Sequence, residues 1–140
     1  MSREATVLLV DDDEIDCETV QRSFRKHQLS NPITIAQDGV EALQILRTTE
    51  NGVRRPYLIL LDLNMPLING FDFIAALRQL SFPNKENVKI IVLTSSSQSQ
   101  DIEQAHSLGV DHYLTKPLTV NELQNTIFTL RKKALRAENG

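Results

Sequence analysis

The stretch Leu58-Ile59-Leu60-Leu61-Asp62 decides how this chain folds. Its apolar residues form an unbroken run that ends on an acid. A continuous apolar run of this kind is typical of a strand that is buried on both faces of a parallel sheet. A carboxylate at the end of a buried strand is costly to desolvate, so its presence there indicates a chemical role.

The same pattern occurs a second time near the N-terminus, where the apolar run Thr6–Val10 is followed by Asp11, Asp12 and Asp13. Parallel strands bring their carboxyl ends to the same edge of a sheet, where ligands bind in open α/β folds. We therefore expect the acids of the two runs to meet at one edge and to form a cation site.

Apolar runs alternate with amphipathic stretches along nearly the whole chain. The predicted strands are Thr6–Val10, Ile33–Ala36, Leu58–Leu61, Lys89–Leu93 and Asp111–Leu114. The predicted helices run from about Glu14 to His27, from Asp38 to the loop at Asn51-Gly52, from the turn Asn69-Gly70 through Leu77, from Ser99 to Gly109, and from Thr119 onward. Capping-box patterns at Asp38/Glu41 and Thr119/Glu122 mark two helix starts. Strands alternating with helices predict an α/β fold, a doubly wound five-stranded parallel sheet with five helices in the flavodoxin-like order 2-1-3-4-5.

Composition excludes several classes of protein. With 140 residues, the chain suits a single domain. Its net charge of −3 shows no bias toward nucleic acid or an acidic membrane. No apolar run approaches the roughly 20 residues of a bilayer-spanning helix, and the polar N-terminus lacks a signal-peptide core. The one cysteine, Cys17, excludes an internal disulfide, so we expect a cytoplasmic protein.

The strand ends supply the residues of a candidate site. These polar residues are Asp11 and Asp12, Asp62, Thr94 and Ser95, and Lys116 followed by Pro117. Three neighbouring carboxylates would raise one another's pKa values unless a cation lay between them. Mg²⁺ fits best, because it prefers oxygen ligands and keeps positions open for water and phosphate oxygens. The Lys116 ammonium and the Thr94 hydroxyl suit the oxygens of a phosphoryl group.

With these residues in place, the chain resembles the receiver domain of two-component response regulators. The resemblance covers roughly Thr6 to Arg131. Its motifs are Val10-Asp11-Asp12, Leu61-Asp62-Leu63-Asn64-Met65-Pro66, Asn69-Gly70, Leu93-Thr94-Ser95 and Lys116-Pro117, in the right order and spacing. We expect a single receiver domain over residues 5–136 and a disordered tail over residues 137–140.

The resemblance implies a role for each motif residue. Asp62 is implied to be the phosphoacceptor that attacks a phosphohistidine on a partner histidine kinase. Magnesium ligands are implied to be Asp12, Asp62 and the backbone carbonyl of Asn64, with Asp11 acting through water. The protein is then a phosphoacceptor that assists its own phosphorylation and dephosphorylation, and not an enzyme in the usual sense.

The remaining motif residues are implied to bind the phosphoryl group or to respond to it. Lys116, Thr94 and Ser95 would hold its oxygens, and Tyr113 matches the aromatic residue whose rotamer is coupled to Thr94 in the switch. The peptide bond before Pro117 is expected to be cis.

Two further acids have a simpler interpretation. Asp13 and Asp16 lie at the start of the predicted helix Glu14–His27, where negative charge is favourable. We therefore assign both to the end of that helix and not to the site.

Two other functions compete with this interpretation. An aspartyl-phosphate phosphatase of the haloacid dehalogenase type also uses Asp, Thr and Lys, but its Asp-x-Asp-x-Thr pattern is absent, since Ile15 stands where the Thr should be after Asp11 and Asp13. A degenerate receiver that works only as a docking module usually lacks one of the acids, the Thr or the Lys, and this chain keeps them all.

The route by which a signal would leave the domain can also be predicted. No DNA-binding output domain is expected, so the signal must pass through the receiver surface to a downstream protein target or a second copy. We expect phosphorylation to change the face formed by the predicted helix at Ser99–Gly109, the strand Asp111–Leu114 and the last helix. Phe128 and Leu135 lie off the apolar stripe of that last helix, which indicates a homodimer at this face. The polar segments Thr48–Pro56 and Ser81–Asn87 resemble stand-alone receivers that partner phytochrome-type histidine kinases.

Overall fold

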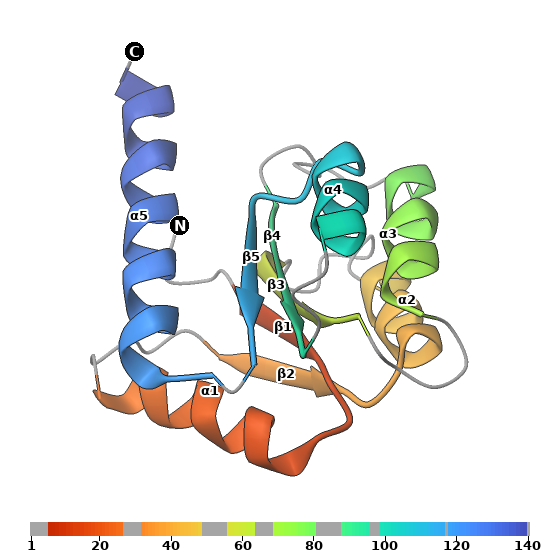
Figure 1. The fold of residues 1–140 in the computed structure, drawn as a ribbon, viewed down its shortest axis with the longest axis horizontal. Helices are drawn as coiled ribbons and strands as arrows, with labels where there is room; N and C mark the ends of the chain where they lie inside the picture. The colour runs from red at the N-terminus through yellow and green to blue at the C-terminus, as the bar shows by residue number, and fades with distance from the viewer. Residues whose placement is uncertain are drawn as a thin grey trace.

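The computed structural model describes residues 6–26, 32–48, 56–63, 69–80, 88–95, 99–116 and 118–139. Strands and helices alternate along the chain (Figure 1). The strands are β1 (Thr6–Val10), β2 (Ile33–Ala36), β3 (Pro56–Asp62), β4 (Lys89–Thr94) and β5 (His112–Thr115). The helices are α1 (Glu14–Lys26), α2 (Gly39–Thr48), α3 (Gly70–Gln79), α4 (Ser99–Ser107) and α5 (Val120–Asn139).

All neighbouring strands pair in parallel, and the sheet order is β2-β1-β3-β4-β5. This is the order that the sequence predicts. The strands β1, β3 and β4 occupy the centre of the sheet, and the apolar residues 7–10, 58–61 and 90–93 are all buried. Burial on both faces explains why these strands are continuous apolar runs and do not alternate with polar residues.

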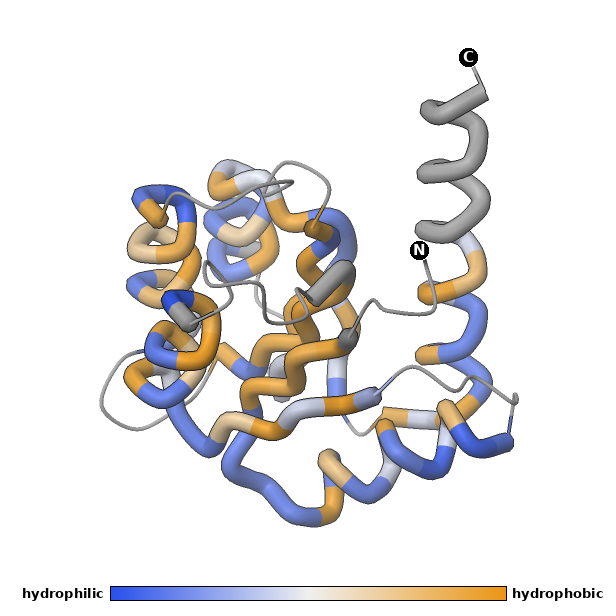
Figure 2. Tube along the Cα trace, turned by 180° about the vertical axis from the view of Figure 1, so that it is seen from behind, coloured by the Kyte–Doolittle hydropathy of each residue, from blue (hydrophilic) through white to orange (hydrophobic). Residues whose placement is uncertain are grey.

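Two apolar cores sandwich the sheet, because successive strand residues point to opposite faces. One core joins Val7, Leu9 and the matching residues of β3 and β4 to α1 and α5. The other joins Leu8, Val10 and their neighbours to α2, α3 and α4. Figure 2 shows the hydrophobic sheet between helices that carry a hydrophilic outer side. Each buried aliphatic side chain stabilises the fold by roughly 1.5–3 kcal/mol.

Polar side chains cap the N-termini of several helices by accepting hydrogen bonds from backbone N–H groups of the first turn. Asp13 accepts from the N–H of Ile15 at 2.8 Å, and Asn69 accepts from the N–H of Asp72 at 2.9 Å. Both capping boxes form with altered geometry. Their first residues accept from the N–H groups of Glu41 and Glu122 as predicted. The Glu41 carboxylate, however, accepts from the Gln37 N–H, and the Glu122 carboxylate accepts from the Thr119 hydroxyl.

The strand ends differ from the predicted ones. β3 includes Asp62, and β4 continues to Thr94. Asp62 is in register with Leu93, and the N–H of Leu63 donates to the Leu93 carbonyl at 3.1 Å. Backbone pairing between β3 and β4 therefore extends both strands to a polar last residue. The apolar pattern alone does not indicate this extension.

The structure also differs from the prediction at the C-terminal tail, residues 137–140. Helix α5 continues through Asn139, because Arg, Ala and Glu at residues 136–138 favour the helical conformation. The predicted end of α1 at His27 and the segments 49–55 and 81–87 lie outside the described residues. Within the described residues, no helix combines the length and apolar character that crossing a bilayer requires.

Gly70 fixes the chain directly after β3. Its N–H donates to the Leu63 carbonyl at 2.9 Å. A Cβ atom at Gly70 would lie 2.6 Å from Leu63 Cδ2 and 2.7 Å from Leu63 Cα. Because the second contact is with backbone, a side chain at this position must displace the segment that carries Asp62.

We predict that Gly70→Ala destabilises the protein by about 1–3 kcal/mol, because the added methyl group overpacks this contact. Helix propensity alone would favour alanine, by less at this first residue of α3 than the about 1 kcal/mol of a helix interior, so the sign of the change tests the contact. Urea unfolding measures the free energy, and Ala75→Gly on the exposed side of α3 gives the propensity effect by itself. A Gly70→Ala variant more stable than the parent protein would contradict this packing.

Candidate functional site

The acids at the ends of β1 and β3 meet, as the two apolar runs predict. Carboxylate oxygens of Asp11, Asp12 and Asp62 all lie within 4.8 Å of one another. Asp11 and Asp62 are buried, and Asp12 is exposed. One edge of the sheet therefore carries two acids that are shielded from water and one that is open to it.

Asp11 is the most tightly enclosed of these acids. Its N–H donates to the Ala36 carbonyl at 3.0 Å, and its Oδ1 accepts from the N–H of Asp13 at 2.9 Å. Its Oδ2 is buried and has no hydrogen-bond donor among the described residues. Burial raises the pKa of Asp11 to about 7. The hydrogen bond from Asp13 and the charge of Lys116 oppose this rise, whereas Asp62 and Asp16 add to it.

Lys116 lies among these carboxylates, directly after β5. Its Nζ donates to Asp62 Oδ2 at 3.1 Å and lies 3.4 Å from Asp11 Oδ2 and 2.5 Å from Asp16 Oδ2. Burial by itself would lower the pKa of Lys116, but its contact with Asp16 and the charges of Asp11 and Asp62 outweigh burial, so the pKa is raised. We call Lys116 and these three acids the ion cluster.

Asp16 is the site residue that sequence reasoning missed. The assignment of Asp16 to the helix end is wrong, because its side chain is only 10% exposed and contacts Lys116. Asp13 performs the capping role that was expected of both acids. The spacing of Asp16, Val20 and Ser23 is a signal that could have identified it, since residues four and then three apart lie on one face of a helix.

The predicted phosphoryl-binding and switch residues lie along the same sheet edge. Thr94 is fully buried at the end of β4, and its carbonyl accepts from the Lys116 N–H at 2.7 Å. Ser95 follows it and is exposed. Tyr113 is half-buried in β5, pairs with Val92, and packs against the core beneath α2, α3 and α4.

Asn64 and Pro117 lie outside the described residues, so their implied roles remain predictions.

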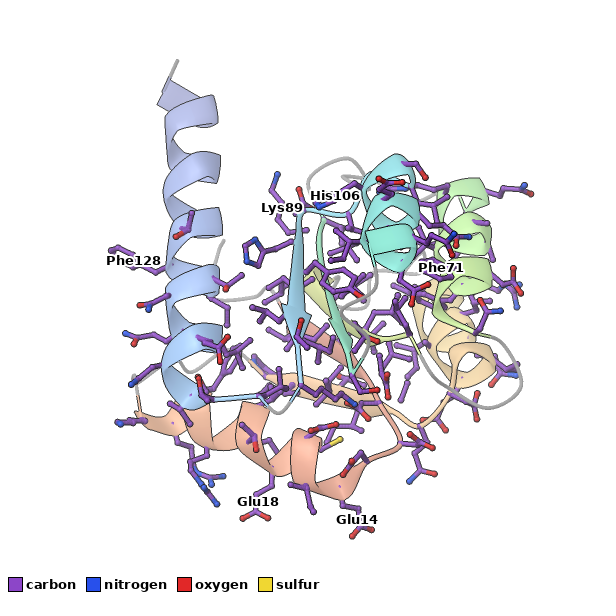
Figure 3. All side chains as sticks on the ribbon, in the orientation of Figure 1. Glu14, Glu18, Phe71, Lys89, His106 and Phe128 are labelled. Carbon is purple, nitrogen blue, oxygen red and sulfur yellow. The ribbon has the colours of Figure 1, made fainter. Side chains whose placement is uncertain are left out.

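A surface groove of about 500 Å³ opens beside the acids. It is lined by residues of α1, including Glu14 and Glu18, and by Ile35 of β2 and Gln37. Glu14 and Glu18 project from the outer side of α1 in Figure 3. The groove gives solvent and a ligand access to Asp12.

Cys17 lies beneath the acids and takes no visible part in their chemistry. Its thiol is buried and donates to the Asp11 carbonyl at 3.6 Å. Burial, followed by the charge of Asp11, raises the pKa of the thiol to about 11. Because the thiolate is the reactive form, Cys17 is inert near neutral pH.

The donor set fits a hard divalent cation. Mg²⁺ takes oxygen ligands and binds through one or two carboxylates. Asp11, Asp12 and Asp62 offer such oxygens within a short distance of one another, and Asp11 Oδ2 is buried with an ion-pair contact to Lys116 but no hydrogen bond. The raised pKa of Asp11 is what a carboxylate shows when burial and like charges disfavour its ionised form.

Comparisons with known proteins agree with this geometry. The sequence profile of the response regulator receiver domain matches residues 7–128. Response regulator Rcp1 from Synechocystis is 33% identical over 120 residues, which are 84% of this chain and 80% of Rcp1.

Solved structures give the same result. The crystal structure of the Mn²⁺-bound form of response regulator Rcp1 is 29% identical, with a TM-score of 0.71 over 91% of this chain and 90% of that chain. The phosphorylated cyanobacterial phytochrome response regulator RcpA is 29% identical, with a TM-score of 0.73 over 87% of this chain and 88% of that chain. The sheet order, the acids at its edge and a profile match over most of the sequence lead to one conclusion: this chain belongs to the response regulator receiver domain family.

Proposed function

We propose that this protein accepts a phosphoryl group on Asp62 from a phosphohistidine of a partner histidine kinase. The observation that carries the proposal is the contact of 3.1 Å between Asp62 Oδ2 and Lys116 Nζ, beside the carboxylates of Asp11 and Asp12. Asp62 thus has a nucleophilic oxygen that contacts a cation, and it lies next to two further carboxylates that offer oxygen ligands.

The transfer requires little covalent chemistry from the protein. An Asp62 oxygen attacks phosphorus, the P–N bond of the donor breaks, and the imidazole nitrogen leaves with the electron pair. An ionised carboxylate needs no general base, so positioning and charge neutralisation provide the catalysis. Lys116 holds one phosphoryl oxygen, and the hydroxyl of Thr94 and the exposed Ser95 donate to others.

Asp12, Asp62 and the backbone carbonyl of Asn64 would hold Mg²⁺ directly, with Asp11 acting through water. The ion would offset the negative charge on the phosphoryl oxygens. The fit of the acids supports this assignment, as does the Mn²⁺-bound form of Rcp1.

The output would pass through the face formed by α4, β5 and α5. Contacts to the added phosphoryl group favour one of two states of Thr94 and Tyr113, which is a population shift. Tyr113 lies on the α4 side of the sheet, so a change in its rotamer alters this face. Phe128 is 56% exposed and projects from α5 on the side away from the sheet (Figure 3), which supports a homodimer through this region.

We also propose a phytochrome-type histidine kinase as the phosphodonor and a second protein as the downstream target. The similarity to RcpA and to the bacteriophytochrome response regulator RtBRR supports the phytochrome-type kinase as phosphodonor. RtBRR is 29% identical, with a TM-score of 0.77 over 90% of this chain and 77% of that chain.

We predict that acetyl phosphate adds one phosphoryl group to the purified protein in the presence of Mg²⁺. Intact mass spectrometry measures the adduct, which Asp62→Ala should abolish because the accepting carboxylate is gone. Asp72→Asn, an exposed acid of α3, serves as the control and should retain it. An unmodified parent protein, or an equal adduct on Asp62→Ala, would refute the proposed function.

Mg²⁺ should raise the melting temperature by a few degrees, because it binds the folded acids and not the unfolded chain. Asp12→Asn should remove most of this increase, and Glu103→Gln on the exposed side of α4 should not change it. In the metal-free protein, the raised pKa of Asp11 favours folding at low pH, and this contribution is lost as pH rises through about 7. The increase should therefore be larger at about pH 8 than at about pH 6. A thermal shift that Asp12→Asn leaves unchanged would contradict the ligand assignment.

Beryllofluoride, a phosphoryl mimic, should shift the Tyr113 ring resonances and promote self-association. Phe128→Ser should weaken the association, because it removes an exposed apolar side chain from α5. Val40→Ser removes one from α2 and is the matched control. Sedimentation velocity measures the oligomeric state. A parent protein that stays monomeric at high concentration, with and without the mimic, would rule out the dimer.

A further inference from the structure

Asp16 is the closest acidic neighbour of Lys116. Nζ lies 2.5 Å from Asp16 Oδ2, against 3.1 Å from Asp62 Oδ2 and 3.4 Å from Asp11 Oδ2. The Asp16 side chain is 10% exposed and that of Lys116 is 17% exposed, so little water intervenes to weaken their attraction. The ammonium is therefore shared between the proposed phosphoacceptor and an acid on α1.

We propose that Asp16 is a positioning residue that holds Lys116 toward α1 and so weakens the binding of a phosphoryl group at Asp62. This inference rests on the proposed function, because it assigns Asp16 a regulatory part in the same site. Asp16 acts through Lys116 and does not itself touch the phosphoryl group.

The two partners differ in their freedom to move. Asp16 lies in the first turn of α1, whose Val20 and Phe24 are buried in the core shared with α5. Its carboxylate is consequently held in place. Lys116 carries its charge on a flexible four-carbon stem. When a phosphoryl group forms at Asp62, the ammonium must divide its ionic contacts between that group and Asp16.

Charge acts in the same direction as geometry. The carboxylates of Asp11, Asp16 and Asp62 surround one ammonium, and Asp12 lies close to Asp11 and Asp62. Asp16 adds a negative charge beyond those proposed to hold the cation. That charge repels an incoming phosphoryl anion, and at short range in a partly buried site the repulsion is much stronger than in water. Asp16 therefore favours the unphosphorylated state in two ways.

The test is Asp16→Asn, which keeps the shape of the side chain and removes its charge. At saturating Mg²⁺, we expect beryllofluoride to bind about tenfold more tightly to this variant than to the parent protein, because both the competition and the repulsion are lost. The aspartyl-phosphate formed with acetyl phosphate should decay more slowly by a similar factor. NMR titration measures the affinity, and intact mass spectrometry measures the decay.

Two variants separate a role through Lys116 from a general effect. Glu18→Gln removes a charge from the same helix at a side chain that is 65% exposed, and it should change the affinity less than twofold. Asp16→Glu restores the carboxylate and should return the affinity toward that of the parent protein. An Asp16→Asn variant that binds beryllofluoride equally or more weakly would overturn the inference.

A measurement on the parent protein covers the case in which Asp16→Asn does not fold. Saturation with beryllofluoride should shift the carboxyl carbon resonance of Asp16, because Lys116 moves partly from Asp16 toward the mimic. An unmoved Asp16 resonance, with binding seen elsewhere, would overturn the inference. A parent protein that binds no beryllofluoride and accepts no phosphoryl group would instead refute the proposed function, so the two failures differ.

Discussion

The attraction between Lys116 and the acids around it is the constraint on which this site depends. Asp11, Asp16 and Asp62 lose most of their contact with water on folding, and each would be costly to bury alone. Lys116 lies within ion-pair distance of all three. Removing one partner of a buried ion pair typically costs about 3–5 kcal/mol, because a charge is left uncompensated. The ion cluster therefore couples the chemistry of the site to the stability of the fold.

The backbone holds the ion cluster in place through the order of the strands. Asp11 follows β1, Asp62 ends β3, and the two strands are direct neighbours. Lys116 follows β5, which lies two strands from β3, and its N–H donates to the Thr94 carbonyl at the end of β4. In a parallel sheet all these ends point to one edge. Four elements separated in the sequence thus meet without an irregular strand at this edge.

Much of this arrangement follows from the sequence because burial on both faces leaves a simple pattern. The short apolar run Leu58–Leu61 favours a central strand, and the acids after the apolar runs then share an edge. Asp16 could not be separated from Asp13 in this way, because a helix N-terminus favours both acids. Only the packing of α1 against the sheet turns Asp16 inward and leaves Asp13 to cap the helix. Likewise, hydrogen bonds from neighbouring strands determined that β3 includes Asp62, and these bonds leave no local signal.

The position of Cys17 allows the reactivity of its thiol to report on the packing of α1. Cys17 is the single thiol of the chain, lies on the inner side of α1 and donates a hydrogen bond to the Asp11 carbonyl. Cys17 is 9% exposed and lines the groove beside Asp11 and Asp12, so an alkylating reagent reaches its sulfur more easily when α1 moves away from the end of β1. The rate of alkylation would thus report how open this end of α1 is, with and without ligands, in a protein that needs no engineered label.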